Sequence, residues 1–79
     1  MIITAYTLEG SICTLRLRVG AKVLGVSDQY GRISIFVEED PDEESFEYKH
    51  FYLRRVHNQV PGGTFVGIVN DIVVYKGVT

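Results

Sequence analysis

Cysteine, histidine and tryptophan are scarce in this chain. Its 79 residues include one cysteine, two histidines and no tryptophan. The single cysteine, Cys13, excludes an intramolecular disulfide and a zinc site built from several thiolates. Because its neighbours are apolar, we expect Cys13 to be a small buried side chain rather than a reactive thiol.

Basic residues are also too few for a protein built to neutralise phosphates. Eight lysine and arginine residues stand against ten acidic ones, so the formal net charge is −2. A protein that binds nucleic acid mainly through phosphates shows a basic excess instead. We therefore expect a protein partner, a second copy of the chain included, in preference to nucleic acid.

Targeting and catalytic motifs are missing as well. No apolar run follows a basic start and none approaches 20 residues, so we expect no secretory signal, no membrane partner and a reducing compartment. No Gly-x-Ser-x-Gly elbow or glycine-rich phosphate loop occurs. His50 and His57 are the only histidines, and neither is paired by spacing with a nucleophile. We expect a protein that is not an enzyme and needs no cofactor.

A period of two in apolar residues is the main positive signal. Odd positions from Cys13 to Val19 are apolar, whereas the even positions between them are threonine or arginine. Such alternation is typical of a half-buried strand. Similar runs elsewhere predict a single all-β domain over residues 1–79, an antiparallel barrel or sandwich of six to seven strands. The expected strands cover residues 1–8, 11–19, 22–27, 32–37, 46–56, 64–69 and 72–78.

The segment 46–56 leaves one alternative open. Its aromatic alternation favours a strand, but Tyr48, Phe51, Tyr52 and Arg55 would also cluster at helical spacing. A short helix at 46–56 therefore stays open. In contrast, both faces of residues 32–37 carry apolar bulk, which predicts a strand at the centre of its sheet.

Several turns can be predicted from local chemistry. Gly20 suits a reversal before the apolar run 22–27, and Gly25 would let another backbone or ring approach closely. Leu24 is expected to pack with its apolar neighbours. Residues 28–31 begin with aspartate and end with glycine, as type I turns favour. Asn70-Asp71 predicts a tight two-residue hairpin.

Residues 38–45 form an acidic segment with one proline, Pro41. It holds six of the ten acidic residues. Because like charges repel into water and proline interrupts a ladder, we expect a solvated loop. Its spacing does not match an EF-hand, so we expect no metal at Asp40, Asp42 and Glu44. The loop either keeps the protein in solution or binds a basic partner surface. The candidate partner-binding residues are Glu38, Glu39, Asp40, Asp42, Glu43 and Glu44.

A second candidate site combines basic, aromatic and glycine residues. Basic side chains among aromatics can stack single-stranded nucleic acid, and glycine-rich turns can offer amides to phosphate. A small nucleotide or a single strand is therefore the alternative ligand. The residues for that site are Arg54, Arg55, Tyr48, Tyr52, Gly62 and Gly63, and the candidate protein-interface anchors are Tyr30, Tyr48, Tyr52 and Tyr75.

The order of these motifs resembles that of a family of short phage-encoded proteins of unassigned function. The matching residues are 20–24 (Gly-Ala-Lys-Val-Leu), Asp40-Pro41, and 61–67, which close the chain with a Gly-Thr-Phe hairpin. The resemblance implies a small β fold, phage origin, and a place in the host cytoplasm or the virion. It carries over no active site, and the acidic segment is heavier here than in that pattern.

The sequence thus supports one main hypothesis and two alternatives. The main hypothesis is a small non-enzymatic accessory protein that binds a macromolecular partner, a host or defence factor, through the acidic segment. One alternative is a structural or assembly oligomer of a phage particle. The other is a β-barrel that binds a small nucleotide or a single-stranded nucleic acid.

Overall fold

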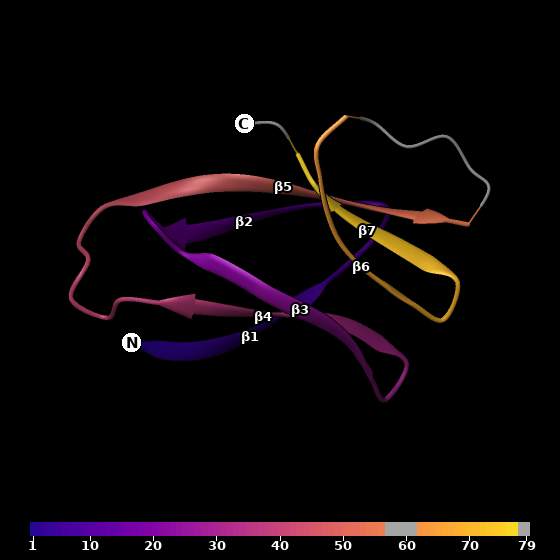
Figure 1. The fold of residues 1–79 in the computed structure, drawn as a ribbon, viewed down its shortest axis with the longest axis horizontal. Helices are drawn as coiled ribbons and strands as arrows, with labels where there is room; N and C mark the ends of the chain where they lie inside the picture. The colour runs from indigo at the N-terminus through magenta and orange to yellow at the C-terminus, as the bar shows by residue number, and fades with distance from the viewer. Residues whose placement is uncertain (57–61, 78–79) are drawn as a thin grey trace.

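Seven strands and no helix make up the described part of a computed structural model, which covers residues 1–56 and 62–77 (Figure 1). This confirms the all-β prediction and the strand at 46–56. His57, with the rest of the segment 57–61, lies outside the described residues. The strands are β1 (Ile2–Leu8), β2 (Ile12–Arg18), β3 (Lys22–Gln29), β4 (Arg32–Glu39), β5 (Phe46–Arg55), β6 (Thr64–Val69) and β7 (Ile72–Lys76).

The strands form two antiparallel sheets. One has the order β1-β4-β3 and the other the order β2-β5-β7-β6, so the architecture is sandwich-like. β4 lies at the centre of its sheet, as its two apolar faces predicted. No helix capable of spanning a membrane occurs in the part of the chain that the structure describes.

A small apolar core lies between the sheets. From β2, Leu17 is buried and Cys13 and Leu15 pack partly buried against the core, as the alternation predicted. Val19 was predicted on the same face but is exposed, because β2 ends at Arg18. Among the described residues, the buried hydrophobic side chains are Leu8, Leu17, Ile35, Val37, Phe51 and Val74.

Both two-residue hairpin turns use left-handed backbone angles. Asn70 and Asp71 have φ of 48° and 62°, which confirms the predicted tight hairpin. The type I turn predicted over residues 28–31 is wrong. β3 continues to Gln29, and the turn consists of Tyr30 and Gly31, with φ of 55° and 79°. Positive φ at both positions matches the right-handed twist of the paired strands, which a type I turn does not.

The close approach predicted at Gly25 occurs at Gly67 instead. A Cβ at Gly25 would meet nothing within 4 Å, whereas a Cβ at Gly67 would lie 2.5 Å from Cγ1 of Val26. The predicted packing of Leu24 is also wrong, because a register shift between Val23 and Gly25 leaves Leu24 exposed. β3 and β6, which belong to different sheets, therefore meet through Val26 and a glycine.

This contact predicts that alanine destabilises the fold at Gly67 but not at Gly25. Gly67→Ala should lower the free energy of unfolding by about 1–3 kcal/mol, because the new methyl group overpacks a short branched side chain. Gly25→Ala is the matched control and should be neutral or slightly stabilising, because space is open there and alanine costs less entropy in a strand. Urea unfolding followed by circular dichroism measures both.

A second substitution separates overpacking from other effects of alanine. In a Val26→Ala background the methyl group has room, so Gly67→Ala should cost much less there than in the wild type. An equal cost in both backgrounds would contradict the contact.

Candidate functional site

Glu39 is not part of a solvated loop. It is the last residue of β4, and only 1 % of its surface is exposed. The prediction of a loop beginning at Glu38 is therefore wrong, and Glu39 lies where a partner cannot reach it. The physical reason is alternation, since Ile35, Val37 and Glu39 follow one another on the face of β4 that points to the core.

The rest of the acidic segment connects β4 to β5. Two of its carboxylates cap the turn: Asp40 Oδ1 accepts from the amide of Asp42 at 2.9 Å, and Glu43 Oε1 accepts from the amide of Ser45 at 2.9 Å. Asp42 and Glu44 are exposed. Within residues 1–56 and 62–77, no three carboxylate, histidine or cysteine side chains gather as a metal site would need.

Each carboxylate oxygen of Glu39 accepts a hydrogen bond from a side chain of a different strand. Tyr6 Oη, from β1, donates to Oε1, and Arg18 Nη1, from β2, donates to Oε2 at 3.0 Å. Strands of both sheets thus meet at one carboxylate. Burial pushes the pKa of Glu39 up, but the hydrogen bonds from Tyr6 and Arg18 and the charge of Arg18 outweigh it and hold the pKa below its ordinary value.

Removing the charge of Glu39 should destabilise the fold. We expect Glu39→Gln to lower the free energy of unfolding by about 1.5–3 kcal/mol, because Arg18 loses a charge-assisted hydrogen bond in a partly buried place. Glu44→Gln removes the same charge from an exposed position and should change stability by less than about 0.5 kcal/mol. Equal urea midpoints for the two variants would contradict a structural role for Glu39.

Tyr6 makes the stability of the fold depend on alkaline pH. Burial, then the hydrogen bond to Glu39 and its charge, raise the pKa of Tyr6 from 10.0 to about 12. The folded state therefore keeps a proton that the unfolded chain has lost, so the stabilisation is complete below pH 10 and disappears as pH rises to about 12. The advantage of wild type over Tyr6→Phe in urea unfolding should shrink across that window. A constant advantage from pH 8 to 12 would argue against this linkage.

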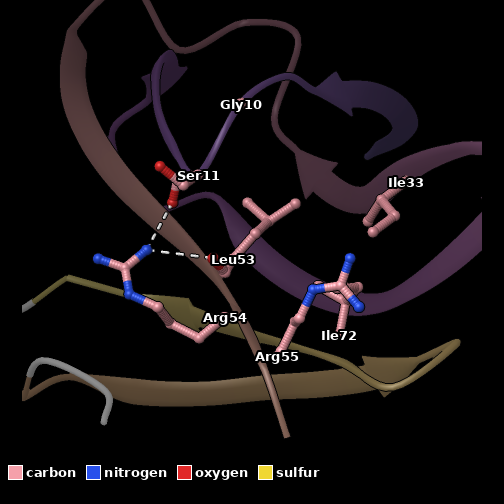
Figure 2. A pocket seen from close by; sticks show the side chains of 7 residues that line it. All are labelled: Gly10, Ser11, Ile33, Leu53, Arg54, Arg55 and Ile72. Carbon is pink, nitrogen blue, oxygen red and sulfur yellow. Dashed lines mark hydrogen bonds between the residues drawn. The ribbon is translucent and has the colours of Figure 1, made fainter. Parts of the chain in front are cut away.

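A hollow of about 490 Å³ contains two of the predicted ligand-binding residues (Figure 2). Arg54 and Arg55 both line it, beside the β1–β2 connection. Arg54 Nη1 donates to the carbonyl oxygens of Ser11 and Leu53, at 3.0 and 3.1 Å, so part of its guanidinium is engaged by backbone. The lining residues are Gly10, Ser11, Ile33, Leu53, Arg54, Arg55 and Ile72.

The other residues of that predicted site lie elsewhere. Tyr48 and Tyr52 occupy even positions of β5, which point away from the core, and neither lines the hollow. Gly62 and Gly63 precede β6 and do not line it either. A Cβ at Gly63 would collide with the carbonyl oxygen of Lys76, so this glycine allows a backbone contact with β7. The structure therefore does not gather the predicted ligand-binding residues in one hollow, although Arg54 also lies over the ring of Tyr52.

The outward face of the four-stranded sheet carries a row of large apolar side chains. The register places Ile12 opposite Tyr52, Tyr52 opposite Tyr75, and Tyr75 opposite Phe65, so the row crosses all four strands. The rings of Phe65 and Tyr75 pack edge to face, with centroids 5.8 Å apart. Four side chains on this face are more than half exposed: Ile12 (56 %), Tyr48 (66 %), Phe65 (54 %) and Ile68 (59 %).

Three arginines lie over aromatic rings on the same face, among them Arg18, whose guanidinium carbon is 5.5 Å from the ring centroid of Phe46. The guanidinium carbon of Arg16 is 4.1 Å from the ring centroid of Phe46, and that of Arg54 is 5.6 Å from the ring centroid of Tyr52. No aspartate, glutamate or lysine occupies an outward position in the described strands of this sheet. We call this surface the aromatic face; it comprises Ile12, Thr14, Arg16, Arg18, Phe46, Tyr48, His50, Tyr52, Arg54, Phe65, Ile68, Val73 and Tyr75.

The sequence identified this face only in part. Tyr48, Tyr52 and Tyr75 were predicted anchors and lie on it, whereas Tyr30 lies in the β3–β4 turn. Ile12, Phe65 and Ile68 were missed. Their strand parity was visible, but the bulge between Phe65 and Gly67, which puts Phe65 and Ile68 on one face, was not.

Two polar side chains of the aromatic face, Thr14 and His50, contact each other. His50 Nδ1 and Thr14 Oγ1 are 2.8 Å apart, so the described histidine is hydrogen-bonded to its cross-strand neighbour. Cys13, the one thiol, lies partly buried on the opposite side of β2, against the core. The described histidine and the thiol therefore point to opposite faces of the sheet.

Comparisons of the chain with protein-family models, with curated proteins and with solved structures found no match.

Proposed function

We propose that this chain is a non-enzymatic accessory protein that binds a protein partner through the aromatic face. One observation carries the proposal: Tyr, Phe, Ile and Arg are exposed together there, without an outward Asp, Glu or Lys in the described strands. Aromatic residues and arginine are enriched at the centres of protein interfaces, where lysine and carboxylates are depleted. Tyrosine and arginine also dominate the binding energy of such interfaces.

The acidic segment becomes a secondary element in this proposal. Its exposed carboxylates, Asp42 and Glu44, lie just before Phe46 at one end of the aromatic face. A partner that fits both regions presents carboxylates to Arg16 and Arg54 and a basic group to the acidic segment. Opposite charges at two places on one surface would determine the orientation of the partner and speed its association.

The sequence resemblance narrows where to look for that partner. A phage-encoded accessory protein acts on a host or defence factor, in the host cytoplasm or on the particle. The small-nucleotide alternative has weaker support, because its predicted residues do not line one hollow and Arg54 is partly engaged by backbone carbonyls. The single-strand alternative shares the aromatic face and is therefore an outcome of the experiment below.

A capture experiment with matched variants tests the aromatic face. Tagged wild-type protein and two variants are incubated with host-cell lysate, and the retained proteins are identified by mass spectrometry. Tyr48→Ala with Phe65→Ala removes two exposed aromatic side chains and should weaken the captured complex by at least tenfold, because each anchor contributes more than about 1 kcal/mol. Leu24→Ala, an exposed apolar position on β3, should leave capture unchanged.

Two outcomes would contradict the proposal. One is a partner that binds the double variant as tightly as the wild type, provided both have the same urea midpoint. The other is retention of a labelled oligothymidine at physiological salt that the same two substitutions abolish, since this would identify the face as a single-strand platform.

A further inference from the structure

The free edge of β1 is a second surface that the fold leaves open. β1 pairs with β4 along its whole length, from Ile2 opposite Glu39 to Leu8 opposite Ile33. No other strand of the described residues pairs with β1. The backbone amides and carbonyls that point away from β4 therefore have no strand to pair with inside the described chain.

The sequence of β1 does nothing to protect this edge. Residues 1–8 contain no charge, proline or glycine, and the pairing with β4 has no bulge. Isoleucine, threonine and tyrosine favour extended backbone. Ile3 is 63 % exposed on the outer side of the strand. Proteins usually protect an edge strand with lysine, proline or a bulge, because a straight uncharged edge adds a further strand.

The other edge strands do carry such protection. β3 has the bulge at Leu24 and packs against β6 through Val26 and Gly67. β6 has its own bulge beside Phe65. β2 carries Arg16 and Arg18. Among the described strands, β1 is the one edge that is straight, uncharged and open.

We propose that β1 pairs antiparallel with β1 of a second copy of the chain. The two three-stranded sheets then become one six-stranded sheet across a two-fold axis. An axis at Ala5, the middle of the strand, pairs all of β1 and sets Ile3 opposite Thr7 of the other copy. Because β1 is uncharged, two copies meet there without repulsion.

A second copy fits this edge better than it fits the aromatic face. Two aromatic faces would bring Arg16 and Arg54 of one copy towards the same arginines of the other. β1 belongs to the other sheet, so the dimer leaves the aromatic face available for a different partner. The proposed dimer therefore does not depend on the proposed function, and each can fail alone.

Mass measurements across a concentration series test the dimer. Light scattering after size exclusion, from about 1 to 100 μM, should give twice the chain mass for the wild type at the upper end. Ala5→Lys puts two like charges directly opposite each other, so its dissociation constant should rise at least tenfold. Leu24→Lys adds the same charge at an exposed position of β3 and should dimerise like the wild type. Circular dichroism checks that both variants fold.

Cross-linking tests the register without adding charge. Ala5→Cys should form a disulfide between two copies on mild oxidation, because residues at the axis of an antiparallel pair have Cα atoms about 4.5–5.5 Å apart. Thr7→Cys should not, since it faces Ile3 of the other copy. A wild type that is monomeric at 100 μM would overturn the proposal. So would a dimer that Ala5→Lys leaves intact while Tyr48→Ala with Phe65→Ala separates it.

Discussion

The carboxylate of Glu39 joins the two layers of this sandwich. The chain has 79 residues, and its described part buries six hydrophobic side chains. The core is therefore small, and one buried charge has a large effect on stability. Tyr6 and Arg18 approach that charge from different sheets. A slip of β4 by one residue would move Glu39 to the outer face and leave the partly buried Tyr6 hydroxyl and Arg18 guanidinium without their acceptor. The cluster therefore specifies the register of β4 as well as stabilising it.

The way the two layers meet decides which surfaces stay open. On one side, Val26 of β3 packs so closely on Gly67 of β6 that a side chain at position 67 would collide with it. On the other side, the chain crosses from β1 to β2 through a short connection, and β1 keeps a free edge. The two proposed interaction surfaces lie on different sheets, so partner binding and self-association are compatible in one molecule.

The charge of the whole chain is a poor guide to the charge of its surfaces. A net charge of −2 argued against a phosphate-binding surface, and the acidic segment 38–45 was the predicted binding site for a basic partner. In the fold, Glu39 is buried, Asp40 and Glu43 cap a turn, and the outward positions of the four-stranded sheet carry arginine. Alternation keeps carboxylates off the outward positions of this sheet, because residues next to each other in sequence point to opposite faces.

Local chemistry by itself determined the strands, the Asn70-Asp71 hairpin and the central place of β4, because alternation and turn preferences depend on neighbouring residues. Tertiary structure decided which strands pair, where the bulges fall and which face of β5 points outward. Both faces of β5 carry aromatic rings, so periodicity could not tell that Phe51 lies in the core while Tyr48 is exposed. The burial of Glu39 was equally hidden, since its two partners lie 33 and 21 residues away in the chain. Such long-range pairing depends on the packing of whole sheets, which no short stretch of sequence encodes.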